Sequence, residues 1–126
     1  MSNDKIAVVD VQAVVENSAQ VKTLREEQIT KTNDLNAWLI NAQAEVKAEA
    51  DQAKQEALLQ KYNAEFAQKR AELAQKYQEK LKVISESISQ TVAEYAKQND
   101  YSLVLAKNIT LYGGVDITEE IAKIVK

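Results

Sequence analysis

The sequence predicts a mostly helical α+β protein, in which a long antiparallel helical hairpin is combined with a small β body built from both chain ends. The 126 residues contain no proline, and both glycines are adjacent, at 113 and 114, so strong chain breakers are absent before that point. Residues 18–99 are rich in Ala, Glu, Gln, Lys and Leu, the best helix formers. Short β-branched runs lie only near the two ends. The length suits one domain, residues 1–126.

The N-terminal segment 5–11 reads Lys-Ile-Ala-Val-Val-Asp-Val, and its β-branched residues predict a buried strand. The alternative is the first turn of a helix that continues into residues 12–15. Asn17 and Ser18 then have side chains suited to an N-cap, so a long helix is expected to begin at Ser18.

The central segment 18–99 must fold back on itself or assemble, because a single helix of its length would extend about 120 Å. Two apolar stripes at three- and four-residue spacings predict two helices. Between them, residues 48–56 contain no apolar side chain larger than Ala, which predicts the hairpin tip. The first stripe is also thin between Leu24 and Leu35. That stretch is interpreted either as a solvated helix surface or as a loosely packed, flexible part of the arm.

The C-terminal pattern changes after Asp100. Residues 101–106 and 109–112 are strand-like runs separated by Lys107-Asn108, which predicts a β-hairpin. Gly113-Gly114 ends it, and a short helix follows, with Asp116 or Thr118 as its N-cap, acids in the first turn and lysines in the last.

Composition excludes several classes of function. Without Cys or His there is no zinc finger, disulfide framework, thiol nucleophile or Ser-His-Asp triad, and no phosphate-binding loop is present. No catalytic, cofactor-binding or metal-binding residue is therefore predicted, and an enzyme is disfavoured. Asp10, Asp100 and Asp116 are interpreted as turn and cap residues. A net charge of −3 does not indicate a nucleic-acid partner.

Targeting signals are also absent. No apolar run approaches the roughly 18–20 residues of a membrane span, and residues 1–4 lack the features of a signal peptide. The chain is therefore expected to be either a mature exported form or a cytosolic protein.

The small β body predicts an obligate oligomer, because three short strands and one narrow helical stripe bury too little apolar surface alone. Each buried aliphatic side chain contributes roughly 1.5–3 kcal/mol. The residues expected to supply the interface are Ile6, Val8, Val9, Val11, Leu103, Leu105, Ile109, Leu111 and Tyr112.

Two segments at the chain ends are distinctive: Lys5-Ile-Ala-Val-Val-Asp-Val-Gln-Ala-Val14, and Tyr101-Ser-Leu-Val-Leu-Ala-Lys-Asn-Ile-Thr-Leu-Tyr-Gly-Gly through Lys126. With the helical middle, they resemble the Skp/OmpH family of periplasmic chaperones. The resemblance covers essentially the whole chain. It implies a jellyfish-like homotrimer in which helical hairpins project from a β body and surround a cavity. It also implies an ATP-independent holdase that keeps unfolded outer-membrane or other envelope proteins in that cavity. The localisation it implies is the periplasm or cell envelope.

Two residue-level expectations accompany this resemblance. Apolar residues that face the cavity are candidate client contacts, although a simpler interpretation is that most of them hold one helix to the other: Trp38, Leu39, Val46, Tyr62, Phe66 and Tyr77. The basic character of well-known members is absent, since residues 18–99 contain twelve Lys/Arg and twelve Asp/Glu. Attraction to anionic lipid therefore has no support in the sequence, and weak membrane association stays an open question.

An alternative from another class is an oligomeric coiled-coil spacer that binds folded partners. It explains the helices equally well but gives no purpose to the two strand-rich ends.

Overall fold

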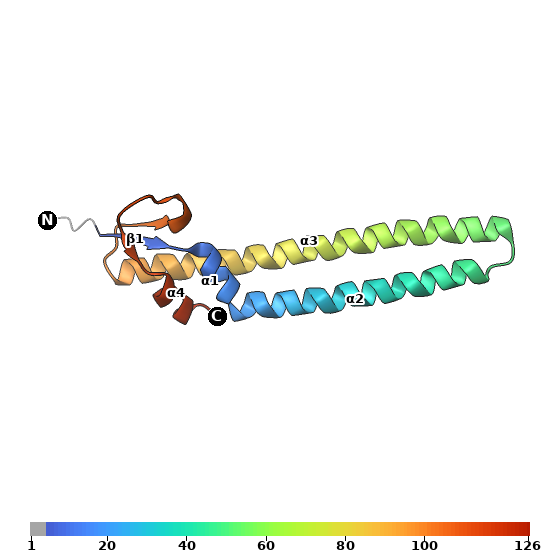
Figure 1. Cartoon of the computed structure of the whole chain (residues 1–126), viewed down its shortest axis with the longest axis horizontal. Helices are drawn as coiled ribbons and strands as arrows, with labels where there is room; N and C mark the ends of the chain where they lie inside the picture. Colours follow the sequence, from blue (N-terminus) through green and yellow to red (C-terminus); the bar gives the residue numbers. More distant parts are fainter. Residues whose placement is uncertain (1–4) are drawn as a thin grey trace. The chain divides into compact units, whose positions relative to one another are not determined.

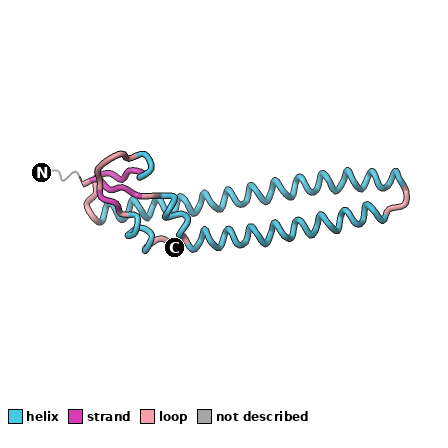
Figure 2. Tube along the Cα trace, in the orientation of Figure 1, coloured by secondary structure: helices cyan, strands magenta, loops and turns pink. Residues whose placement is uncertain are grey.

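The structure, a computed structural model, describes residues 5–126 and confirms the mostly helical α+β class (Figures 1 and 2). Residues 1–4, on which the expectation about a signal peptide rests, lie outside the described part. The elements in chain order are β1 (Ile6–Val9), α1 (Val11–Asn17), α2 (Ala19–Ala48), α3 (Gln52–Gln98), β2 (Leu103–Ala106), the 3₁₀ turn η1 (Lys107–Ile109), β3 (Val115–Asp116) and α4 (Thr118–Ile124).

The chain divides into two compact units. The first contains the described residues up to Thr23 together with Leu81–Lys126, and the second contains Leu24–Lys80. Helices α2 and α3 contribute residues to both units.

The first strand is shorter than the sequence pattern suggests. β1 ends at Val9, because the carboxylate of Asp10 accepts a 3.1 Å hydrogen bond from the backbone N–H of Ala13 and caps helix α1. Val11 therefore lies on a helix, exposed, and the prediction that it belongs to the strand was wrong. Ser18 behaves as expected: its hydroxyl accepts from the N–H of Val21 at 3.4 Å, and α2 begins at the next residue.

The predicted C-terminal β-hairpin was also wrong. The sheet has the order β2-β1-β3, and both outer strands run parallel to β1. The register pairs Ile6 with Leu103 and Ala7 with Val115. After β2 the chain turns through η1, and residues 110–114 form a loop instead of a strand, so Ile109, Leu111 and Tyr112 lie outside the sheet. β1 thus pairs along both of its edges.

The connection between the two parallel outer strands crosses the face of β1, and Gly114 permits that crossing. Its φ is +85°, and a Cβ on it would lie 2.3 Å from Cγ2 of Val8. The loop consequently covers Val8, which is buried.

The core of the first unit lies on the opposite side of the sheet. Ala7 and Val9 pack there with Val14 of α1, Ile88 of α3, and Ile117 and Ile121. α4 begins at Thr118 with Glu119 and Glu120 in its first turn and Lys123 in its last. Its N-cap position is Ile117, not Asp116 or Thr118, although the Asp116 carboxylate accepts from the N–H of Thr118 at 3.0 Å.

The second unit is a helical hairpin, with α2 and α3 running antiparallel (Figures 1 and 2). Residues 49–51 connect the helices and fall inside the range 48–56 expected for the tip. Asp51 caps α3 by accepting from the N–H groups of Ala53 and Lys54, at 2.9 and 3.2 Å. Gln55 closes the turn by donating a 2.8 Å hydrogen bond to the carbonyl of Val46.

Candidate functional site

An aromatic cluster lies in the seam between α2 and α3 of the second unit. The ring of Trp38 meets that of Tyr62 edge-on at 5.8 Å between centroids, and it stacks on Phe66 at 6.5 Å. The ammonium of Lys69 lies 5.3 Å from the centre of the Trp38 ring. Aromatic pairs of this geometry contribute roughly 0.5–1.5 kcal/mol each, so this cluster holds the two helices together.

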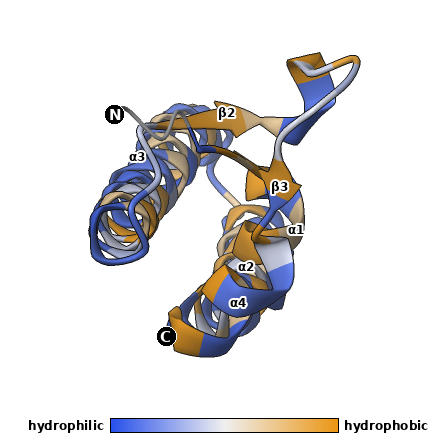
Figure 3. Ribbon diagram, turned by 90° about the vertical axis from the view of Figure 1, so that its left-hand side faces the viewer, coloured by the Kyte–Doolittle hydropathy of each residue, from blue (hydrophilic) through white to orange (hydrophobic). Residues whose placement is uncertain are grey.

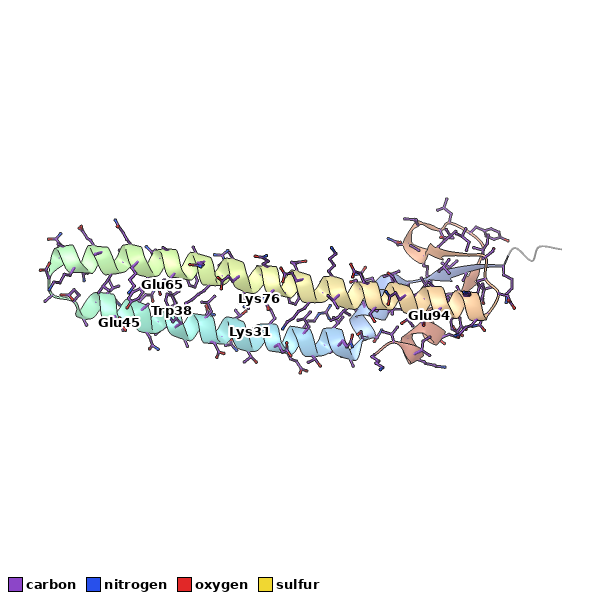
Figure 4. All side chains as sticks on the ribbon, turned by 180° about the vertical axis from the view of Figure 1, so that it is seen from behind. Lys31, Trp38, Glu45, Glu65, Lys76 and Glu94 are labelled. Carbon is purple, nitrogen blue, oxygen red and sulfur yellow. The ribbon has the colours of Figure 1, made fainter. Side chains whose placement is uncertain are left out.

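Tyr62 also links the helices through a polar contact. Its hydroxyl donates to the carboxylate of Glu45, which lies seven residues, or about two helical turns, after Trp38 on α2; Figure 4 labels both residues along this helix. This hydrogen bond raises the pKa of Tyr62, and partial desolvation and the nearby charges of Glu45 and Glu65 act in the same direction. The phenol is therefore protonated and remains a donor throughout the physiological pH range.

The seam is only partly filled. A groove of about 520 Å³ lies beside the stretch in which the apolar stripe is thin, and it is lined by Arg25, Gln28, Ile29, Thr32, Asn33 and Tyr77. The groove exists because amide and hydroxyl side chains occupy positions where a filled seam would have Leu or Val. This supports the interpretation of loose packing there.

A second groove of about 350 Å³ lies nearer the tip. Leu39, Val46 and Tyr62 line it together with Ala42 and Leu59. A third hollow, of about 250 Å³, lies between Leu35, Trp38 and Leu73. All six candidate client contacts are therefore half-buried in the seam; Leu39, Val46, Tyr62 and Tyr77 line the two larger grooves, and Trp38 the third.

Three apolar side chains that were not among the predicted client contacts are exposed on the hairpin. Ile29, Ile40 and Leu59 each have about half or more of their surface in solvent. Ile29 and Ile40 are eleven positions apart, which is close to three helical turns, so they share one face of α2. That spacing was the signal available in the sequence.

Charged side chains on the hairpin are mostly solvated. Within residues 5–126, two ion pairs have nitrogen–oxygen distances below 4 Å, and the one on the hairpin joins Lys80 to Glu27 at 3.6 Å. Figure 4 shows Lys31 and Lys76 along the same two helices. Exposed pairs of this kind contribute at most about 1 kcal/mol, so the seam is held mainly by apolar contacts.

In the first unit, one face of the sheet is turned away from the core. Side chains alternate along β1, so Ile6 and Val8 lie on the face opposite Ala7 and Val9. We define the outer face as Ile6, Val8, Leu103 and Leu105 of the strands together with Ile109, Leu111 and Tyr112 of the crossing loop. Figure 3 shows apolar colour along the strands and on this loop.

The predicted interface residues divide into three groups by their exposure. Ile6, Leu103, Ile109, Leu111 and Tyr112 are exposed on or beside the outer face, and Leu105 is half-buried. Val8 and Val9 are buried within their own chain, and Val9 belongs to the core. Val11 is exposed on α1. Val115 of β3 is half exposed and was not anticipated.

Within residues 5–126, no group of three or more acidic side chains is placed to hold a metal ion. Over the same range, no helix combines the length and apolar character that crossing a membrane requires.

Comparison with known proteins identifies the family. A search of curated proteins finds no match to this chain. Residues 5–125 match the family model described as "Outer membrane protein (OmpH-like)", which covers both strand-bearing ends and the helices between them. The match confirms the resemblance read from the two ends of the sequence, and it supports a periplasmic chaperone-type role in general. The chain belongs to the OmpH-like, or Skp/OmpH, family.

Proposed function

We propose that this protein is an ATP-independent holdase that assembles as a homotrimer and keeps unfolded outer-membrane or other envelope proteins from aggregating. Family membership supports the general chaperone role. The proposal adds the mode of action, the assembly and the class of client.

The observation that carries the proposal is the partly filled seam of the helical hairpin. Two grooves of about 520 and 350 Å³ combine aliphatic or aromatic side chains with amide groups. Such a lining offers apolar contact to many unrelated segments and hydrogen-bonding groups to their backbones. A surface of this kind binds weakly and with little sequence preference, which suits a holdase.

Individual residues take different parts in this proposal. Leu39, Val46 and Tyr77 line the grooves and contact clients. Trp38 and Phe66 stack on each other and hold the helices together. Tyr62 does both, since it lines a groove and contacts Trp38. Ile29, Ile40 and Leu59 extend the client surface to the exposed side of the hairpin.

Charge balance indicates how clients are attracted. Residues 18–99 contain twelve basic and twelve acidic side chains, so long-range steering of charged clients is weak. Capture then depends on apolar contact, and it is expected to change little between low and moderate salt. Release depends on a competing site with higher affinity rather than on nucleotide.

Self-association occurs through the outer face of the sheet. The structure leaves Ile109, Leu111 and Tyr112 in water, which is unfavourable for a contiguous group of large apolar side chains. A second and third copy would cover them and complete the small β body.

The first test is light-scattering mass after size exclusion, alone and with a urea-denatured outer-membrane barrel protein diluted into buffer. The expected results are a mass near three times 14.1 kDa and a soluble complex with one client. A trimer that leaves the client to precipitate would contradict the holdase and favour a coiled-coil spacer. A monomer would contradict the assembly.

A paired substitution separates client contact from folding. Ile29→Ser combined with Ile40→Ser should weaken client capture. The free energy of unfolding should stay within about 0.5 kcal/mol of the wild type, because both side chains are exposed. Ile124→Ser on α4 is the matched control, because it makes the same substitution at a half-exposed site outside the hairpin. Equal capture by both variants would show that the exposed hairpin face does not contact clients.

A further inference from the structure

The loop that crosses the outer face is closed at its base by one ion pair. Lys107, which follows β2, places its ammonium 2.8 Å from Oδ2 of Asp116 at the end of β3. The segment between these residues carries Ile109, Leu111 and Tyr112. The ion pair therefore joins the two points at which the loop leaves and re-enters the sheet.

Asp116 is itself fixed to the rest of the unit. Its Oδ1 accepts from the backbone N–H of Thr118 at 3.0 Å and from the Thr118 hydroxyl. That hydroxyl in turn accepts from the N–H of Asp10 at 2.9 Å. Lys107 is the first of the groups that lower the pKa of Asp116, to about 2, so the carboxylate is ionised at physiological pH.

The loop between these two residues has an ordered backbone. Thr110 donates from its hydroxyl to the carbonyl of Ala106 at 2.8 Å and from its N–H to the carbonyl of Lys107 at 3.1 Å. Gly114 packs on Val8. Nevertheless Leu111 is 104% exposed, Tyr112 is 98% exposed and Ile109 is 76% exposed. A loop whose backbone is held in this way and whose largest side chains lie in water is built as a contact surface.

We propose that the Lys107–Asp116 ion pair is a clamp that positions Ile109, Leu111 and Tyr112 to bind a second copy of this chain. The inference rests on the proposed self-association through the outer face. It assigns Lys107 and Asp116 as positioning residues for assembly rather than as part of the apolar contact.

Two observations favour a second copy as the occupant. With Ile6 and Leu103, the three loop side chains expose on the order of several hundred Å² of apolar surface, a large part of the roughly 800 Å² per partner that a standard interface buries. The clamp also leaves neither Lys107 nor Asp116 unpaired beside this surface. In a symmetric assembly, an unpaired charge in the contact would face its own copies and repel them.

The test compares assembly by light scattering over a dilution series. Lys107→Met, which leaves the Asp116–Thr118 hydrogen bonds intact, should raise the midpoint concentration for dissociation about threefold. Lys107→Arg should restore wild-type assembly. Lys80→Met is the matched control, since it removes the Glu27 ion pair at similar side-chain exposure, 50% and 49% against 55% and 45%. It should leave assembly unchanged.

The outcomes separate the clamp from the proposed function. If the wild type is a monomer, the self-association and the clamp are both overturned. If the wild type assembles and Lys107→Met assembles equally well, only the clamp is overturned. Leu111→Ser supplies a second check, because a fully exposed side chain is not needed for protomer folding. Unchanged assembly in that variant would remove the loop from the interface and contradict the proposal.

Discussion

The backbone N–H of Asp10 donates a 2.9 Å hydrogen bond to the hydroxyl of Thr118, a residue 108 positions further along the chain. A similar contact joins the hydroxyl of Ser18 to the carbonyl of Lys126, at 2.7 Å. Both lie in the first unit, so its N-terminal and C-terminal segments are tied by specific polar contacts as well as by the apolar core. Each contact satisfies a partly buried group that would otherwise lose its partner.

Thr118→Val is expected to lower the free energy of unfolding by about 1–3 kcal/mol. The substitution keeps the shape of the side chain but leaves the N–H of Asp10 without its acceptor and Asp116 without one donor. Urea denaturation followed by circular dichroism measures the change. Thr30→Val is the control, because its hydroxyl donates to the carbonyl of Glu26 on an exposed helix and its loss should cost less than about 0.5 kcal/mol. Equal losses in the two variants would contradict the role of the Asp10 contact.

Asp116 makes the free energy of unfolding depend on pH in the acidic range. Its pKa is lowered from 3.8 to about 2, first by the hydrogen bond from Lys107 and then by those from Thr118. Because the pKa is lower in the folded state, the contribution is present above pH 3.8 and is lost as the pH falls through about 2. The side chain is 45% exposed, so the contribution should stay below about 1 kcal/mol.

Unfolding of the wild type and Asp116→Asn, compared between about pH 5 and pH 1.5, measures this effect. The wild type should be the more stable at pH 5, and the difference should disappear at the acid end. In Lys107→Met the titration of Asp116, followed by carbon NMR, should move to higher pH. A difference that is constant over the whole range would argue against the lowered pKa.

The two glycines of the loop allow strain to be separated from steric overlap. Both have positive φ, but a Cβ at Gly113 would have nothing within 4 Å, whereas one at Gly114 would overlap Val8. Gly113→Ala should therefore cost about 1 kcal/mol from backbone strain alone, and Gly114→Ala should cost about 1–3 kcal/mol more. Val8→Ala combined with Gly114→Ala should recover part of that loss in a double-mutant cycle. Additive effects would show that the loop does not lie on Val8.

Asp100 terminates α3 in a left-handed conformation, with φ at 61°. The N–H of Tyr101 donates to the carbonyl of Ala96 at 2.9 Å and that of Asp100 to the carbonyl of Lys97 at 3.5 Å, the pattern of a Schellman motif. Asp100→Gly should raise the free energy of unfolding by about 0.5–1 kcal/mol, since glycine adopts this φ without a Cβ penalty and the substitution removes a negative charge from a helix C-terminus. Asp100→Asn removes the charge alone. A gain of the same size in that variant would assign the effect to charge rather than to conformation.

The helical part of the fold follows directly from the sequence, because periodicity and capping are local. Ser18 is a good N-cap wherever the chain goes, and a stretch with no apolar side chain larger than Ala surrounds the turn at residues 49–51. A turn at Lys107-Asn108 was predicted, and the chain turns there through η1, but the strand expected after it does not form. The parallel sheet was not predicted, because strand propensity does not show which segments pair. Residues 109–112 have strand propensity, but the two edges of β1 are occupied by β2 and β3.

The candidate site shows the same division between local and tertiary information. Spacing placed Trp38 on the apolar stripe of the first helix, and Tyr62 and Phe66 on that of the second, and the structure brings the three rings together. The sequence pattern did not indicate which of the interface candidates would be buried within their own protomer. Val9 packs into the core and Leu111 lies in solvent, although both are aliphatic residues in strand-like runs. The difference arises from the crossover of the chain, which no local pattern encodes.

Trp38, the single tryptophan, allows the two roles proposed for the seam to be tested separately. Phe66 stacks on its ring, Tyr62 meets it edge-on and the ammonium of Lys69 lies 5.3 Å from its centre, so we expect packing of the helices, rather than client contact, to be its main role. Trp38→Ala should lower the free energy of unfolding by about 2 kcal/mol, less than a fully buried tryptophan would because the ring is half-buried.

Client capture is expected to respond differently. Trp38→Phe keeps an aromatic ring in the cluster, so the variant should capture client as the wild type does, and the emission maximum of wild-type Trp38 should not move when client is added. Leu59→Ser, at an exposed position lining the groove nearer the tip, is the comparison in which capture should fall. A shift of Trp38 emission on client addition, or loss of capture in Trp38→Phe at unchanged stability, would mean that clients reach the ring. The aromatic cluster would then be part of the client surface, and the two helices would have to separate locally to admit an unfolded chain.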